Sequence, residues 1–170
     1  MTQRTCIAIV DATRARLFVH DRSSEADGVH DNLTERTDLV NPSRRLTANE
    51  LFSDPRTGSN VAAGHHFGFD DHCDTHLANM DDEFARAAVA QIWQLVTETA
   101  SRRLVVCASP RMLGRLRGAM ANHPHGDVVI LELPRDLVKL TRSELREELV
   151  LHAMLPPIPD RGPTRSARAK

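Results

Sequence analysis

Tyrosine is absent from this sequence of 170 residues, and aromatic residues make up only 4% of it. Proteins that bind nucleic acid by stacking bases need exposed aromatic rings, so a stacking platform is not expected here. No excess of one charge is present either, because 22 Lys and Arg face 23 Asp and Glu for a net charge of −1. Any binding of nucleic acid must therefore come from a local cluster of cations.

The sequence also lacks a long apolar segment and an even set of cysteines. No run is long enough to cross a bilayer, and no apolar stretch follows the N-terminus as in a secretory signal, so we expect neither membrane insertion nor secretion. The three cysteines are Cys6, Cys73 and Cys107, and the first and last lie in expected strands. An odd number of cysteines, two of them within strands, predicts reduced thiols and a cytoplasmic protein.

The segment 103–116 organises the rest of the chain. Its first half is a short continuous apolar run that includes Val105 and Val106, which is typical of a strand buried on both faces. Ser109 is a favourable N-cap and Pro110 suits the first position of a helix, and apolar residues then recur at helical spacing. The segment predicts an interior strand, a tight turn and a crossover helix, and ligands of α/β domains usually bind at such a turn.

The remaining elements follow from periodicity and turn residues. Strands are expected at 5–10, 15–20, 33–40 and 128–133, with a polar loop at 21–31 and an antiparallel meander whose edge strand is 33–40. Helices are expected at 44–52, at 82–100, and from a capping box at Thr141 and Glu144 to about residue 151. The two later strands should run parallel to the first through right-handed crossovers.

This order, β-β-β-α-β-α-β-α, predicts an α/β fold with a mixed five-stranded sheet of the ribonuclease-H-like type. Residues 1–153 would form a single domain carrying a long loop at 53–78, which is rich in Gly, Asp and His. Residues 154–170 are rich in Pro and Arg and are expected to be a disordered tail.

Ribonuclease-H-like nucleases hold two metal ions between several carboxylates at the strand ends. Asp11 stands at the end of the first strand, but the fourth strand ends at Ser109 and Pro110 where a second acid is needed. A nuclease is therefore disfavoured, and Asp11 is better explained as the cap of a turn.

The segment 65–76 gathers the side chains that bind zinc. The candidate ligands are His65, His66, His72, Cys73 and His76, and His72 and His76 would share a face if this segment were helical. Their spacing matches no metal motif, and a polar loop that binds metal only adventitiously is the competing interpretation. A metal-dependent hydrolase using zinc at this segment stays as one alternative function.

Cations gather near the expected strand ends, among them Arg14, Arg16, Arg111 and Arg115. If the first and fourth strands are neighbours, Arg14 and Arg111 lie at the same edge of the sheet. Arginine suits bidentate contact with phosphate, although an ordinary solvated face with some ion pairs explains the same composition.

Several short patterns together resemble a known family. They are Asp11-Ala12 with the segment 14–18, Ser53-Asp54 before Arg56 and Gly58, the segment 108–116, and Asp136-Leu137 with Glu144-Leu145 before Leu149. Over about residues 5–151 the sequence is similar to the bacterial host-attachment protein family, whose members are described as required for attachment to host cells. That family is similar to the middle domain of archaeal and eukaryotic peptide-chain release factors, so the resemblance implies a ribonuclease-H-like fold of the ribosomal-protein and release-factor type.

Two departures from these relatives matter. Pro55 precedes Arg56 and Thr57 follows it, where the family usually has Ser-Asp-Arg-Pro-Gly, so the implied loop conformation is not assured. None of Gln3, Gln91 and Gln94 follows a pair of glycines, so the Gly-Gly-Gln motif for hydrolysis of the peptidyl-tRNA ester is missing.

The resulting hypothesis is a non-catalytic, translation-associated module that binds the ribosome, tRNA or rRNA without a cofactor and has no catalytic residues. Its candidate RNA-binding residues are Asp11, Arg14, Arg16, Ser53, Asp54, Arg56, Arg111 and Arg115. The alternatives are a factor for attachment to host cells, acting directly or indirectly, and the metal-dependent hydrolase.

Overall fold

The computed structural model describes residues 2–25, 28–44, 69–124 and 126–157, with the backbone alone for residues 2, 25 and 69–77. Its elements are β1 (Thr2–Val10), β2 (Arg14–Glu25), β3 (Gly28–Val40), η1 (Pro42–Arg44), α2 (Phe69–Thr99), β4 (Arg103–Ala108), α3 (Pro110–Met120), β5 (Val129–Leu133) and α4 (Arg142–Leu151). The five strands form one sheet in the order β3-β2-β1-β4-β5.

The sheet is mixed, as the sequence predicted. β1 pairs antiparallel with β2, and β2 pairs antiparallel with β3 at the edge. β4 lies between β1 and β5 and runs parallel to both, with Val10 beside Ala108 and Arg103 beside Val129. The predictions of an interior fourth strand and of an edge position for β3 are confirmed, and residues 104–108 are all buried because helices cover both of their faces.

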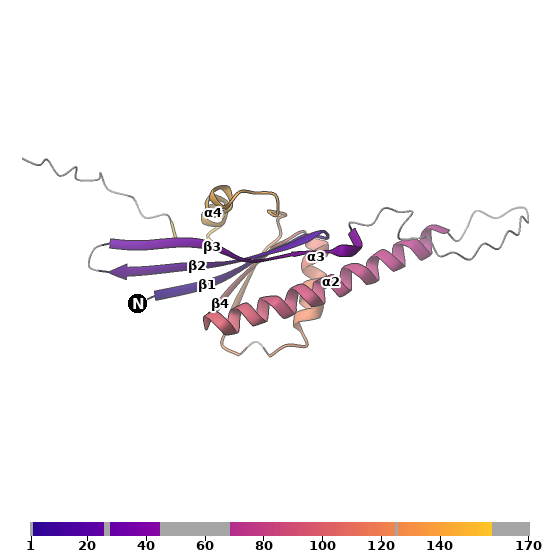
Figure 1. Ribbon diagram of the computed structural model, residues 1–170, viewed down its shortest axis with the longest axis horizontal. Helices are drawn as coiled ribbons and strands as arrows, with labels where there is room; N and C mark the ends of the chain where they lie inside the picture. Colours follow the sequence, from indigo (N-terminus) through magenta and orange to yellow (C-terminus); the bar gives the residue numbers. More distant parts are fainter. Residues whose placement is uncertain (1, 26–27, 45–68, 125, 158–170) are drawn as a thin grey trace, which may run out of the picture.

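Helices cover the two faces of the sheet unequally (Figure 1). One face packs against α2 and α3, with Val106 of the sheet, Ile92 of α2 and Leu116 of α3 in one core. The other face packs against α4, where Phe18 and Leu145 belong to a second core. The alternation of side chains along each strand separates these two cores.

Local chemistry sets the helix starts. The Ser109 side chain accepts a hydrogen bond from the backbone N–H of Met112, and Pro110 begins α3. At α4, Thr141 and Glu144 form the expected capping box, in which the Glu144 carboxylate accepts from the backbone N–H of Thr141 at 2.8 Å. Both predicted caps are confirmed because each depends only on residues within four positions.

Parts of two predicted loops are instead regular structure. Residues 21–25 and 28–31 belong to β2 and β3, which form a long ribbon rather than a polar loop. The error arose because polar residues on both faces hide the strand alternation. Helix α2 begins at Phe69 rather than at residue 82, so 69–78 of the expected loop is helical, since no Gly or Pro interrupts the chain after Gly68. Residues 45–68 lie outside the described part of the chain.

The expected tail does not begin at residue 154. Leu155 is buried in the core beneath α4. The guanidinium of Arg146 donates to the carbonyl of Pro156 at 2.9 Å, and that of Arg22 donates to the carbonyl of Pro157 at 3.1 Å. Side chains distant in the sequence therefore hold this segment, and residues 158–170 lie outside the described part.

Candidate nucleic-acid interface

The carboxyl ends of β1 and β4 form one edge of the sheet. Because Val10 pairs with Ala108 in parallel, Asp11 and Ser109 follow neighbouring strands, and Arg111 stands in the first turn of α3. The antiparallel strand β2 begins at this same edge with Arg14. The topology therefore brings Asp11, Arg14 and Arg111 to one edge of the sheet.

Asp11 has a local structural task. Its Oδ1 accepts from the backbone N–H of Thr13 at 2.6 Å, from the Thr13 hydroxyl at 2.8 Å and from the backbone N–H of Arg14 at 2.6 Å. These bonds close the turn between β1 and β2. Asp11 thus shapes this edge of the sheet by closing the turn with Oδ1.

Arg14 forms a fork-to-fork ion pair across the sheet. Its Nε and Nη2 donate to the two carboxylate oxygens of Asp38 at 2.6 Å each. The hydrogen-bonded carboxylate raises the pKa of Arg14, and the guanidinium lowers the pKa of Asp38 below its usual range. The pair borders a small cavity of about 370 Å³ that Arg44 also lines. The charge of Arg14 is already balanced by Asp38.

Arg16 does not belong to the exposed surface. Its side chain is 10% exposed and forks onto Glu35 at 2.9 Å, which lowers the pKa of that carboxyl. Its Nη1 donates to the carbonyls of Val138 and Leu140 at 3.0 and 2.7 Å. Arg16 is a candidate RNA-binding residue, but its guanidinium already joins the segment before α4 to the sheet.

A second hollow lies between α2 and α3, and we name it the α2–α3 groove. Its volume is about 540 Å³, and it is lined by Asp82, Arg86, Arg111, Gly114, Arg115, Gly118, Ala119 and Asn122. Arg115 is fixed at its base, where the guanidinium pairs with Asp82 and donates to the carbonyl of Ala78 at 2.9 Å. Arg86 and Arg111 are exposed, and neither side chain has an ion pair or hydrogen bond within the described residues.

Two glycines form part of the groove on the exposed side of α3. A Cβ atom placed on Gly114 or on Gly118 would have no neighbouring atom within 4 Å. Packing inside the protein therefore does not require glycine at either position, and the helical backbone is open to close approach there.

The small cavity and the α2–α3 groove are linked through α2. Arg44 forks onto Asp81, with Nη2 to Oδ2 at 2.9 Å, while the next residue, Asp82, pairs with Arg115. Asp81 is buried, so α2 is held firmly at the level of both hollows. Arg44 and Arg115 are thus bound to carboxylates, as Arg14 and Arg16 are, whereas Arg86 and Arg111 have no such partner among the described residues.

Several candidate residues lie beyond what the structure describes. Ser53, Asp54, Arg56, His65 and His66 are outside the described residues. The backbone of His72, Cys73 and His76 is in α2, where the two histidines are one turn apart, but their side chains are not described. Among the described residues no group of three or more His, Cys, Asp or Glu side chains gathers as a metal site would require.

Arg86 was missed by the sequence reasoning. It occupies the position one turn after Asp82 on the polar side of an amphipathic helix, where an exposed cation is ordinary. Only the packing of α2 against α3 puts it in the same groove as Arg111. The one signal in the sequence is the pair Gly114 and Gly118, spaced by one turn on the exposed face of α3.

Comparison with known proteins identifies the family. The sequence profile described as "Protein required for attachment to host cells" matches residues 6–149. The chain belongs to this host-attachment family. The match spans β1 to α4 and agrees with the resemblance carried by the short patterns. No match was found among curated proteins. No helix of the described residues is long and apolar enough to span a membrane.

Proposed function

We propose that this host-attachment-family protein is a non-catalytic RNA-binding protein associated with translation, and that the α2–α3 groove holds an RNA phosphate backbone. The fold we propose is ribonuclease-H-like, of the kind found in the middle domain of release factors, with residues 1–153 as a single domain. The observation that carries the proposal is the pair of exposed arginines, Arg86 and Arg111, which line one groove and have no carboxylate partner in the part of the chain that the structure describes.

The charge of the groove favours an anion. Three arginines and one aspartate line it, so positive charge remains after Asp82 has paired with Arg115. Guanidinium groups bind phosphate oxygens through paired donors. Arg86 and Arg111, on two helices that pack together, can bind successive phosphates of one strand.

The glycines support close approach of a backbone. Glycine in a helix interior costs about 1 kcal/mol relative to alanine, and α3 carries two such residues with open space above them. Because Gly114 and Gly118 carry no side chains, a sugar-phosphate chain can approach the backbone of α3 closely and reach Arg86 and Arg111. The low aromatic content fits recognition through phosphates and shape, which is how proteins bind structured RNA.

The proposal is non-catalytic because no Gly-Gly-Gln motif is present and Gln91 and Gln94 lie within the long helix α2. Asp11, the one acid at the end of β1, is engaged by three donors of its own turn. The ribosome, tRNA and rRNA stay the proposed partners, with a cytoplasmic location.

The test is binding of unfractionated tRNA and of ribosomes by the whole protein at several salt concentrations. The variant R86Q/R111Q should lower the affinity at least tenfold. It should also reduce the slope of log K against log salt by about 1.5 to 2, the value expected for two lost phosphate contacts. The matched control is R135Q/R142Q, which removes two exposed cations from the α4 side. Equal loss in both variants, or no binding at low salt, would contradict the proposal.

A role in attachment is the second candidate, because the family description states it. We propose that this role is indirect and follows from altered translation. Cells carrying R86Q/R111Q should then lose attachment together with ribosome association. Loss of attachment by a variant that still co-sediments with ribosomes, or recovery of the protein at the cell surface, would favour a direct role.

A further inference from the structure

The strand β5 forms one lateral edge of the sheet, because the strand order is β3-β2-β1-β4-β5. The backbone of Val129 points toward β4, since its N–H donates to the carbonyl of Arg102 at 2.9 Å. Successive strand residues alternate, so the N–H and C=O groups of Ile130 and Glu132 point away from β4. Among the described residues these outward groups have no hydrogen-bond partner. An edge of this kind is ready to pair with another strand.

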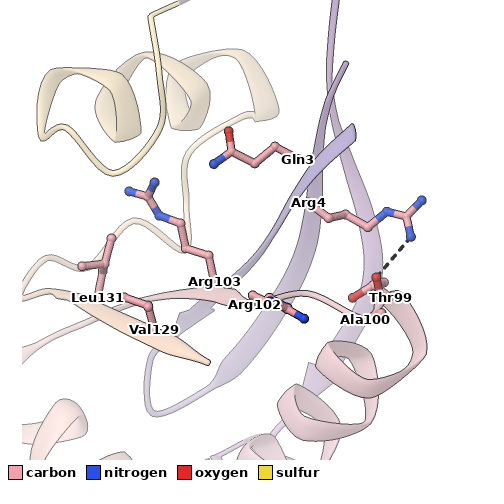
Figure 2. A pocket seen from close by; sticks show the side chains of 8 residues that line it. All are labelled: Gln3, Arg4, Thr99, Ala100, Arg102, Arg103, Val129 and Leu131. Carbon is pink, nitrogen blue, oxygen red and sulfur yellow. Dashed lines mark hydrogen bonds between the residues drawn. The ribbon is translucent and has the colours of Figure 1, made fainter. Parts of the chain in front are cut away.

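The side chains along this lateral edge are mostly apolar. Val129 is 59% exposed, and Val129 and Leu131 line the same open hollow of about 740 Å³ (Figure 2). Glu132 is the one charged residue of β5, and it is paired with Arg117 of α3. The other edge strand, β3, carries four charged residues, and charges are a common means by which proteins block pairing at a sheet edge. Of the two edge strands, β5 is therefore the one suited to association.

The sequence around β5 is complementary to its own reverse. Every second residue from 127 to 135 reads Asp127, Val129, Leu131, Leu133 and Arg135, with an acid before the strand and a base after it. In antiparallel pairing the start of one strand meets the end of the other. A two-fold axis at Leu131 therefore sets Asp127 of one copy near Arg135 of the other, with apolar residues between these charges.

Both charged residues can be reached by a second copy. Asp127 is exposed, and the side chain of Arg135 is 53% exposed although its Nη1 contacts Glu148 at 3.2 Å. Opposite charges that meet across an interface fix its register. An isologous contact requires a surface that is complementary to itself, and the region around β5 has this property.

The same two-fold axis also satisfies the backbone. When Leu131 lies opposite its own copy, Ile130 of one chain lies opposite Glu132 of the other. Both residues have outward N–H and C=O groups, so each of these symmetric pairs can exchange two hydrogen bonds. An axis shifted to Ile130 would also pair outward groups, but it would set Asp127 against Leu133 and leave the charges unmatched.

We propose that this protein forms a homodimer in which two β5 strands pair antiparallel around a two-fold axis at Leu131. The two sheets then become one continuous sheet. Because a single short edge strand makes a small interface, the dissociation constant should lie in the micromolar range. This surface is separate from the α2–α3 groove, and the dimer does not depend on RNA binding.

The experiment is sedimentation equilibrium of the whole protein over a wide range of concentrations at low salt. A monomer–dimer equilibrium is expected. Val129→Lys should weaken the dimer at least tenfold, because it places a cation beside apolar Leu133 of the second copy while residue 129 is largely exposed in the monomer. Asp127→Arg should weaken the dimer by placing like charges together, and adding Arg135→Asp should restore it. R86Q/R111Q should leave the dissociation constant unchanged.

Crosslinking tests the register of the two strands. Leu131→Cys in a Cys73→Ser background should give a disulfide-linked dimer on oxidation. Directly opposed residues of a non-hydrogen-bonded pair have Cα atoms about 4.5 Å apart, which is within the range of a disulfide. Val129→Cys in the same background is the matched control and should stay uncrosslinked, because its two copies would lie about 13 Å apart along the strands. A monomer at all concentrations, an unchanged dimer in Val129→Lys, or crosslinking of Val129→Cys instead of Leu131→Cys would overturn the proposal.

Discussion

Replacing Asp31 by alanine should destabilise this protein more than any other single removal of a charge. Asp31 lies on β3, and its side chain is 9% exposed. Its oxygens accept two hydrogen bonds at 2.9 and 3.0 Å from Nη2 of Arg146 and one at 3.1 Å from its Nε. Nε2 of His20 lies 3.1 Å away, and Arg22 is 3.7 Å away. One carboxylate therefore balances the charge of the buried Arg146 and contacts two further basic side chains.

The expected cost is about 3–5 kcal/mol, the range measured when one member of a buried ion pair is removed and the other charge stays buried. Arg146 is 7% exposed and would keep only its bond to the carbonyl of Pro156. At roughly 3 °C per kcal/mol for a protein of this size, the melting temperature should fall by about 10 °C or more. Asp31→Asn should cost less, because the amide oxygen still accepts one bond.

Urea denaturation at pH 7 measures this cost, and the double variant Asp31→Leu/Arg146→Met is its control. Because the pair is then replaced by apolar groups of similar size, most of the stability should return. A cost below about 1 kcal/mol for Asp31→Ala, or a double variant no more stable than the single one, would refute the assignment of Asp31 as the counter-ion of Arg146.

Three further predictions follow from buried and helical groups. Burial lowers the pKa of His20, although Asp31 opposes this shift, so the unfolded chain binds the proton more readily than the folded protein. The free energy of unfolding should therefore rise with pH up to about 6.5 and flatten above it. Urea titrations from pH 5 to 8 measure this slope, and replacing His20 by Gln should remove it. Gly118→Ala should stabilise the free protein by about 1 kcal/mol in the same urea assay, since its Cβ meets nothing, and should weaken tRNA binding. Burial raises the pKa of the Cys107 thiol to about 12, so mass spectrometry should find Cys107 unmodified by a thiol reagent at pH 8 unless the protein is unfolded.

The parts of the fold that were predictable depend on short stretches of sequence. The continuous apolar run at β4 showed that the strand is interior, and Ser109 with Pro110 showed where α3 begins. The polar ribbon was not predictable from alternation, because polar side chains lie on both faces of residues 21–24 and 28–31 and some of them pair with β1 and α4. Asp31 pairs with Arg146, 115 positions away, so no short stretch of the sequence indicates this contact.

In the candidate site too, the features set by local sequence were predictable and those set by distant contacts were not. Topology alone brought Arg14 and Arg111 to one edge, because parallel strands end together. Whether each cation is available to a ligand depends on distant carboxylates: Asp38 occupies Arg14, Glu35 occupies Arg16 and Asp82 occupies Arg115. Sequence spacing cannot reveal these partners, so it overestimated the number of free arginines and overlooked Arg86.

The distribution of paired and unpaired cations is the strongest argument that the α2–α3 groove binds an anion. A net charge of −1 from nearly equal numbers of acids and bases leaves enough carboxylates to pair most arginines, and the sheet shows such pairs repeatedly. Within the described residues the guanidinium groups of Arg86 and Arg111 nevertheless have no carboxylate partner, and both line the α2–α3 groove. Clustered like charges repel one another and lower stability, so a protein that keeps two such cations in one concave surface gains from them when an anion is bound there.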